Sequence, residues 1–401
     1  MATHFAITEL TKQNMSSNLT SSMANTNRQI NNYLAERPDL YPRYRRARLI
    51  RKVLRKSNNY DLTSRCNLFC EGCFYFEGDD YKQATAVTDT DTWDLFFQQQ
   101  AAAGVSFAFF AGAEPALAQD RLLSAAQHIP RGSIHTNGTI RIRPDIPYSI
   151  QISVWGDENT TKHFRGGNVF WKSIRNFAND PRVRFVFTIN PGNLSQVPGV
   201  VRVMDDYGHR IMFNYFSPTQ SYLDKLSAGA GNDDTYFRIS SQERNMLFGP
   251  ESLLRARDTV NEMIMKYPRA VLQTRAFNDA LTDPQPLYEL DSETGVAMNC
   301  NGRNFDWHQG YRVDLKPSDA KCCMPNVNCS ECRLYTIAIA SFIFQPERFL
   351  HSIAGFCDWL DICDQFARVC LLDGDLEWTP TSEVLSLPLA HAEESESVRH
   401  V

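Results

Sequence analysis

The chain has 401 residues, of which 43% are hydrophobic and 22% are charged, and its formal net charge is −5. These values are typical of a globular protein large enough for one large domain and a smaller appendage, and they exclude a global positive field that would attract nucleic acid. No apolar run reaches the ~18 residues of a membrane span. Eleven cysteines, with no N-terminal pattern of a secretory signal, predict reduced, metal-binding thiols in the cytoplasm rather than disulfides.

The first segments of the chain are polar and then strongly basic. Residues 1–40 begin with Ser-, Thr- and Asn-rich sequence of little periodicity and predict a disordered N-terminus. Residues 41–57 predict a basic helix that covers one edge of the main domain, or alternatively a dock for an acidic peptide, an electron donor or nucleic acid. The apolar residues at helical spacing are Tyr44, Ala47, Ile50 and Leu54.

From 58 to 218 the patterns of strands and helices alternate, which predicts a parallel sheet with helices outside it. Strands are predicted at 59–64, 106–111, 132–136, 149–154, 183–190 and 211–216, and helices at 89–103, 117–128, 168–178 and 197–207. In an α/β fold of this kind, ligand sites gather at the carboxyl ends of the strands.

The remainder of the chain is more irregular. Residues 219–299 predict a linker followed by a helical extension, with a helix near 251–266. Residues 300–377 hold a second group of cysteines and a long helix across 340–371, and 378–401 predict a flexible tail.

Three cysteines directly follow the first predicted strand, in the order Cys66-x3-Cys70-x2-Cys73. Three thiolates on one short loop can hold three irons of a 4Fe–4S cluster and leave the fourth iron open for another ligand. A zinc site is the alternative, although zinc usually takes four ligands in paired C-x2-C units.

This cysteine loop resembles the signature loop of the radical S-adenosylmethionine (SAM) enzymes. The resemblance implies an α/β fold, a partial (βα)6 TIM barrel over 58–218, with the open iron of the cluster chelated by SAM. It further implies that one electron cleaves SAM and releases a 5′-deoxyadenosyl radical, which abstracts a hydrogen atom. The cofactor carries this chemistry, and the protein supplies binding and orientation.

Several later segments resemble other motifs of the same family. Gly112-Ala113-Glu114-Pro115 resembles G-G-E-P with Ala in place of the second Gly, and small residues there allow the backbone to approach the SAM amino group. Arg165 is the candidate for the SAM carboxylate, because a guanidinium binds a carboxylate bidentately. The cofactor-binding residues that the resemblance implies are Gly112, Ala113, Glu114, Asn137, Ser153, Arg165 and Asn190, with Thr188 less firmly placed.

Aromatic residues near the cysteines are candidates for the adenine contact. The family often has an aromatic residue just before the third cysteine, where this chain has Gly72, so Phe74 and Tyr75 are expected to stack on adenine instead. Tyr215, near the end of the sixth predicted strand, is the candidate for a contact with substrate or adenine. No residue stands out as a catalytic acid, base or hydrogen donor.

The second cysteine group resembles the SPASM or twitch extensions of the family, which bind auxiliary iron–sulfur clusters. One auxiliary cluster is expected, held by Cys300, Cys329, Cys332 and Cys323, with Cys322 as the alternative fourth ligand. Two alternatives are a structural zinc on the same thiolates and cysteines that bind no metal at all. The later cysteines, Cys357, Cys363 and Cys370, are expected in the core.

The sequence therefore predicts a radical SAM enzyme that tailors a peptide or a small metabolite, with an electron donor such as flavodoxin or ferredoxin. An adenosyl-transfer enzyme of the hopanoid type is one alternative. A non-catalytic iron–sulfur or zinc protein that binds RNA through the basic helix is another. Neither a membrane span nor a nucleic-acid partner is expected for the enzyme.

Overall fold

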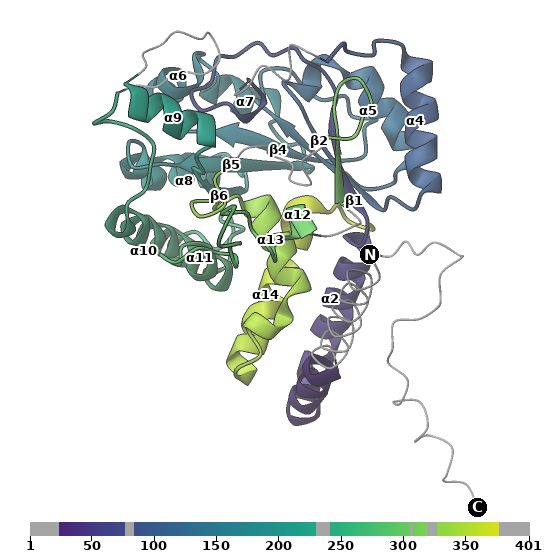
Figure 1. The fold of residues 1–401 in the computed structure, drawn as a ribbon, viewed down its shortest axis with the longest axis vertical. Helices are drawn as coiled ribbons and strands as arrows, with labels where there is room; N and C mark the ends of the chain where they lie inside the picture. The colour runs from purple at the N-terminus through teal and green to yellow at the C-terminus, as the bar shows by residue number, and fades with distance from the viewer. Residues whose placement is uncertain (1–23, 77–83, 230–240, 305–307, 319–326, 377–401) are drawn as a thin grey trace, which may run out of the picture.

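The computed structural model describes residues 24–76, 84–229, 241–304, 308–318 and 327–376, and its centre is a parallel β-sheet (Figure 1). The described residues form seven strands in the order β6-β5-β4-β3-β2-β1-β7, and every neighbouring pair is parallel. The strands are β1 Ser57–Asp61, β2 Phe107–Ala111, β3 Gly132–Thr136, β4 Ser149–Val154, β5 Val183–Ile189, β6 Ile211–Tyr215 and β7 His308–Tyr311.

The six strands predicted from the sequence are all present, and a seventh lies beside the first. β7 pairs with β1 from Ser57 opposite His308 to Tyr60 opposite Tyr311. Its four residues include Gln309 and Gly310, which have little strand preference, so the sequence gives no signal for it. Since β6 and β7 are the two edges of the sheet, this strand order does not close a barrel.

Helices connect the strands and form the extension that follows them. They are α2 Tyr41–Val53, α4 Thr90–Ala102, α5 Gln119–His128, α6 Glu158–Arg165, α7 Phe170–Asn176, α8 Val197–Asp206, α9 Gln220–Ala228, α10 Pro250–Lys266, α11 Arg275–Leu281, α12 Asn301–Asn304, α13 Tyr335–Phe344 and α14 Ile353–Cys370. Short 3-10 turns are η1 Pro38–Leu40, η2 Phe74–Phe76, η3 Pro115–Leu117, η4 Leu194–Gln196 and η5 Pro346–Arg348. Side-chain caps start several helices; the Asp157 carboxylate, for example, accepts a hydrogen bond from Thr160 N (2.9 Å) at the start of α6.

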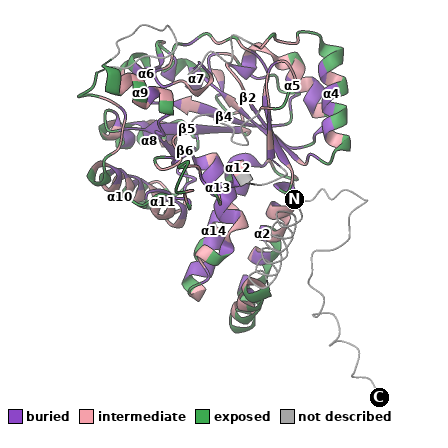
Figure 2. Cartoon of the chain, in the orientation of Figure 1, coloured by how far each residue is buried: buried purple, intermediate pink, exposed green. Residues whose placement is uncertain are grey.

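The two faces of the sheet have different neighbours. Tyr60 of β1 is fully buried and packs edge-on against Phe96 and Phe97 of α4, so this face is covered by the connecting helices. Side chains alternate along a strand, which directs Asn59 and Asp61 to the opposite face. Figure 2 shows that the buried residues run along the strands and along the inner sides of the helices.

Helix α14 covers the amino ends of the strands on that opposite face. The ring of Phe366 packs on Phe107 of β2, with 5.8 Å between the ring centroids. Ser149 at the start of β4 donates a hydrogen bond to the Cys370 carbonyl oxygen (2.9 Å), and Arg184 of β5 donates to that of Arg368 (2.8 Å). The carboxyl half of the same face is therefore left open for a cavity.

The N-terminal segment differs from the expectation of disorder over 1–40. Residues 24–36 are helical, and 1–23 lie outside the described part. Ile30 of this helix is buried, and Tyr33 donates a hydrogen bond to the Leu350 carbonyl oxygen (2.7 Å) and stacks on Phe356. The polar composition conceals these apolar residues, which pack the helix on the start of α14.

Two expectations for helices need correction. The long helix expected across 340–371 is divided into α13 and α14, because Pro346 lacks the amide hydrogen needed to continue α13. The expected linker near 219 contains α9.

The basic helix α2 is docked rather than free. Arg43 forms salt bridges with Asp361 (2.6 Å) and Asp364 (3.1 Å) of α14, and Arg46 forms one with Asp364 (3.2 Å). Tyr44, Ala47 and Ile50 are buried, which confirms the predicted apolar face. None of the helices in the described ranges combines the length and apolar character required to cross a bilayer.

Candidate active site

A cavity of about 550 Å³ lies at the carboxyl ends of the strands and collects most of the candidate residues. Its size is that of a site for a small molecule or cofactor. Each strand contributes to its wall. The strand residues are Asn59 and Asp61 (β1), Phe109 and Ala111 (β2), His135 and Thr136 (β3), Gln151 and Ser153 (β4), Val186 and Thr188 (β5), Asn214 (β6), and His308, Gly310 and Tyr311 (β7).

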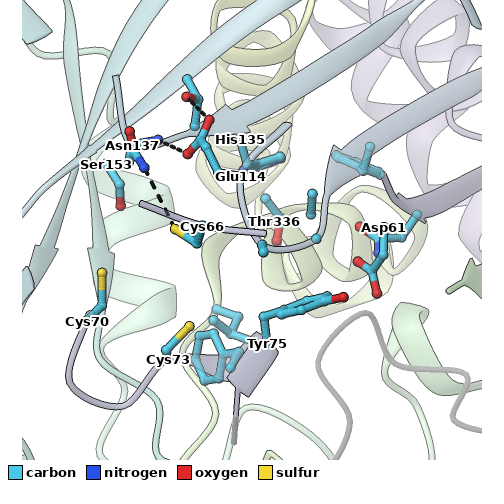
Figure 3. A pocket seen from close by; sticks show the side chains of 18 of the residues that line it. Asp61, Cys66, Cys70, Cys73, Tyr75, Glu114, His135, Asn137, Ser153 and Thr336 are labelled. Carbon is cyan, nitrogen blue, oxygen red and sulfur yellow. Dashed lines mark hydrogen bonds between the residues drawn. The ribbon is translucent and has the colours of Figure 1, made fainter. Parts of the chain in front are cut away.

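Cys66, Cys70 and Cys73 line this cavity from the loop after β1 (Figure 3). The loop is held against α6, since Phe69 N donates to the Arg165 carbonyl oxygen (3.2 Å) and Glu71 N donates to that of Phe164 (2.8 Å). Burial raises the pKa of the Cys66 thiol, and raises that of Cys73 to about 12 with a further contribution from Cys70 nearby. The three thiols thus line one cavity from one short loop.

Three thiols on one short loop beside a cavity are a donor set that suits a cluster. Within the described ranges, no three His, Cys, Asp or Glu side chains are grouped so as to hold one metal ion. Zinc needs its ligands in one tetrahedral shell, whereas each thiolate of a cubane binds a different iron and the donors can stand further apart. The donor set and the adjoining cavity thus suit a 4Fe–4S cluster with an additional ligand.

Gly72 occupies the position before the third cysteine for a steric reason. Its φ is +61°, in the left-handed region that favours glycine. A Cβ atom at this position would lie 2.9 Å from the ring of Phe216, which follows β6. Phe74 and Tyr75 line the cavity instead, from the turn η2.

The turn after β2 is shaped by a close approach of two strands. Gly112 has a φ of +72°, and a Cβ atom there would lie only 2.4 Å from the Asp61 Cα. Ala113 and Glu114 follow it in the cavity wall. The Glu114 carboxylate is buried and accepts hydrogen bonds from Ala116 N (3.0 Å), Thr136 Oγ1 (2.5 Å) and Asn137 N (2.8 Å). Burial raises the pKa of Glu114, while these hydrogen bonds oppose that effect.

Asn137 lines the cavity and is bonded to the cysteine loop. Its Nδ2 donates to Asn67 Oδ1 (2.8 Å) and to Cys66 Sγ (3.9 Å), as Figure 3 shows for the sulfur. Its Oδ1 accepts from both the amide (2.9 Å) and the hydroxyl (2.7 Å) of Thr139. The side chain has used its two donors and its two acceptor sites within the protein, and its predicted contact with SAM stays a prediction.

Ser153 and Arg165 meet at the cavity wall. Arg165 is buried at the end of α6 and donates through one terminal nitrogen to the Ser153 carbonyl oxygen. Its Nε is buried and has no partner among the described residues. A buried donor without a partner is rare in folded proteins, and a carboxylate in the cavity would satisfy it.

Two predicted residues lie outside the cavity wall. Tyr215 faces away from it, because Asn214 takes the inward position on β6, and the Tyr215 hydroxyl donates to Asn278 Oδ1 (2.6 Å). Asn190 caps the turn after β5, where its Oδ1 accepts from Gly192 N (2.8 Å). Thr188, two residues earlier, is the member of β5 that lines the cavity. Strand alternation explains the orientation of Tyr215. The predicted contacts of Tyr215 and Asn190 stay predictions.

The second cysteine group is described only in part. Cys300 and Cys332 are buried and Cys329 is half-buried, whereas Cys322 and Cys323 lie outside the described residues. The described cysteines of this group do not form a metal-binding set on their own. Cys363 and Cys370 are buried in α14, as predicted, and Cys357 is half-buried.

Further polar residues of the cavity wall come from β1, β3 and β7 and were not among the predicted site residues. Asp61 is the most unusual of them, because burial raises its pKa to about 7. Burial lowers the pKa of His135 to about 4, so this ring is neutral at pH 7. Because side chains alternate along a strand, the apolar Tyr60 could have predicted that Asp61 lies on the opposite, inner face. His308 could not be predicted in this way, because strand β7 itself was not predicted.

Similar arrangements exist among solved proteins, at low sequence identity. The crystal structure of Streptococcus suis SuiB bound to S-adenosylmethionine has a TM-score of 0.47 and 14% identity, over 66% of this chain and 60% of SuiB. SuiB bound to the precursor peptide SuiA has a TM-score of 0.47 and 13% identity, over 70% of this chain and 64% of SuiB. Native anSMEcpe with bound AdoMet and Cp18Cys peptide has a TM-score of 0.44 and 15% identity, over 78% of this chain and 87% of anSMEcpe. The chain thus spans less than two thirds of the length of SuiB.

No protein-family model matches the chain, and no curated protein matches it. Fold similarity at this distance does not by itself define an activity.

Proposed function

We propose that this chain is a radical SAM enzyme that binds a 4Fe–4S cluster through Cys66, Cys70 and Cys73 and binds SAM in the adjoining cavity. The observation that carries the proposal is that one cavity collects these three thiols with buried Arg165 and the Gly112 turn. When bound, the reduced cluster and SAM supply a 5′-deoxyadenosyl radical that abstracts a hydrogen atom from the substrate.

The residues of the chain have separate roles in this proposal. Arg165 binds the carboxylate of SAM, since its unpartnered Nε and planar guanidinium suit a bidentate contact. The backbone after Gly112 approaches the amino group without interference from a side chain. Phe74 and Tyr75 provide aromatic faces for adenine.

The substrate in this proposal is a peptide or a small metabolite that is modified in a biosynthetic step. The electron comes from a donor such as flavodoxin or ferredoxin, and the reduced thiols suit the cytoplasm. An auxiliary cluster at Cys300, Cys323, Cys329 and Cys332 also belongs to the proposal, with zinc as the competing metal.

Anaerobic reconstitution with iron and sulfide tests the function. We expect the triple variant of Cys66, Cys70 and Cys73 to Ser to lose about four irons and four sulfides per chain relative to the wild type. Cys357→Ser, a half-buried thiol on α14, is the matched control and should retain them. The wild type should release 5′-deoxyadenosine from SAM when dithionite is added.

The outcomes separate this function from the alternatives. An iron-free wild type after reconstitution would contradict the proposal. A wild type that holds the cluster but forms no 5′-deoxyadenosine would be a metal-binding protein without turnover. Adenosyl transfer would instead attach the adenosyl group to the product, which mass spectrometry of the product distinguishes from hydrogen abstraction.

A further inference from the structure

One end of the cavity is polar and is separated from the cysteines. Asp61 is the last residue of β1, and its carboxylate lies in the cavity; in the view of Figure 3 the Tyr75 ring lies between Cys73 and Asp61. We call Asn59, Asp61 and His308 the Asp61 subsite. All three line the cavity and come from the adjacent parallel strands β1 and β7.

The Asp61 carboxylate has an amide partner but no cation. The Asn59 amide opposes the effect of burial on the pKa of Asp61. No salt bridge reaches Asp61 from any residue in the described ranges, and Arg312, just after β7, instead pairs with Asp314 (3.5 Å). The position of Asp61 is fixed because Gly112 packs directly on its Cα. A fixed carboxylate in a cavity wall, with no cation paired to it among the described residues, is costly unless a ligand supplies the positive charge.

His308 adds to the subsite a buried ring nitrogen that has no hydrogen-bond partner among the described residues. Its Nδ1 lies 3.4 Å from Ser57 Oγ. Its Nε2 is buried and has no partner among the described residues, and the whole side chain is only 4% exposed. Polar atoms buried in this way are nearly always hydrogen-bonded in folded proteins. The histidine therefore offers a hydrogen-bonding nitrogen to a ligand in the same part of the cavity.

We propose that the Asp61 subsite binds a primary ammonium group of the substrate, so that the substrate is a lysine-bearing peptide or a comparable aliphatic amine. This inference rests on the proposed function. An ammonium is compact and carries three donors, so it can pair with the Asp61 carboxylate and still donate to a neighbouring acceptor. The flexible carbon chain of lysine lets the ammonium enter the cavity while the peptide backbone stays outside.

Calorimetric titration of the reconstituted protein in the presence of SAM tests the inference. The probes are acetyl-Gly-Lys-Gly-amide and its norleucine analogue, which lacks only the amine. We expect the wild type to bind the lysine peptide roughly 10-fold or more tightly than the norleucine peptide, as for a charge-assisted hydrogen bond. Asp61→Asn should remove this preference. Asp61→Glu, which keeps the charge, should restore part of it.

A matched control and the wild-type chemistry make the result decisive. Asp206→Asn, at an exposed site at the end of α8, should keep the preference. Equal affinity of the wild type for both peptides, or an unchanged preference in Asp61→Asn, overturns the inference. If the wild type still releases 5′-deoxyadenosine in that case, the proposed function stands alone. A wild type that takes up no cluster overturns the function itself.

Discussion

Asn137 donates a hydrogen bond to the sulfur of Cys66, with 3.9 Å between Nδ2 and Sγ. The same amide also holds Asn67, the next residue of the cysteine loop (2.8 Å). Asn137 itself is fixed through its backbone amide by buried Glu114. A chain of hydrogen bonds thus runs from the end of β2, through the turn after β3, to the first cysteine.

The contact predicts that Asn137 tunes the bound cluster. Hydrogen bonds to thiolate sulfur stabilise the reduced, more negative state, so Asn137→Leu should lower the midpoint potential. A single bond of ordinary strength corresponds to roughly 20–60 mV for one electron. A redox titration followed by electron paramagnetic resonance measures the shift.

The control for Asn137 comes from the same turn. Asn176 donates to the carbonyl oxygens of Gly138 and Thr139, both at 3.0 Å, but not to the sulfur. Asn176→Ala should therefore leave the potential within a few millivolts of the wild type, apart from an effect on stability. An equal shift in both variants would mean that the turn, and not the N–H···S contact, sets the potential.

Arg165 should determine the affinity for SAM. Arg165→Lys keeps one positive charge but loses the planar pair of donors and the buried Nε. We expect the dissociation constant of SAM to rise roughly 10- to 100-fold, as measured by equilibrium dialysis with the reconstituted protein. Arg175→Lys, at an exposed site on α7, should bind as the wild type does. Unchanged binding by Arg165→Lys would assign the carboxylate to another residue.

Gly112 should tolerate no side chain. Gly112→Ala meets both an unfavourable φ of +72° and a contact of 2.4 Å with the Asp61 Cα, and we expect a loss of about 2–5 kcal/mol in the free energy of unfolding. Gly104→Ala separates the two causes, because its φ is +84° and no atom lies within 4 Å of the added Cβ. That variant should lose only about 1–2 kcal/mol. Equal losses in urea denaturation would exclude the steric contribution.

Asp61 should make the stability of the cluster-free protein depend on pH. Burial raises its folded pKa to about 7, above its ordinary value of 3.8, so the folded state retains a proton that the unfolded state releases between pH 4 and 7. Stability from this group is therefore lost as the pH rises through that window. Asp61→Asn should exceed the wild type by about 1–3 kcal/mol at pH 8, after allowance for the partly open cavity, and by less at pH 5.

Urea denaturation of the wild type and of Asp61→Asn at the two pH values provides the measurement. Asp206→Asn is again the exposed control and should show no comparable dependence on pH. The pKa of His135 is lowered and the pKa values of Cys66 and Cys73 are raised in both proteins. Their contributions therefore cancel when the free energies of unfolding of the two proteins are subtracted. A difference that is the same at pH 5 and pH 8 would show that Asp61 is ionised in both states throughout.

Local patterns in the sequence were sufficient to predict six of the seven described strands of the central sheet. The apolar run of β2 and the alternating strand and helix signals predict six of its strands, because each signal lies within one short segment. The cysteine spacing and the small residues at Gly112 likewise predict which loops meet at the carboxyl edge. These are properties of continuous stretches of chain.

Features that depend on contacts between distant segments could not be predicted in the same way. The partner of Asn137 is Cys66, about seventy residues earlier, and nothing in the Thr-Asn-Gly sequence specifies it. Tyr215 and Asn214 are adjacent, and a shift of one residue in strand phase exchanges which of them faces the cavity. All the ligands of the second cysteine group stay predictions, and Cys323 lies outside the described residues.

The pairing of β7 with β1 joins two strands that are synthesised far apart in time during translation. β1 is complete at residue 61, but one of its two neighbours is not synthesised until residue 311. During that interval the strand that leads into the cysteine loop exposes an open edge, which can pair with other nascent chains. Translation through residue 311 is therefore needed before both edges of the first strand can be paired.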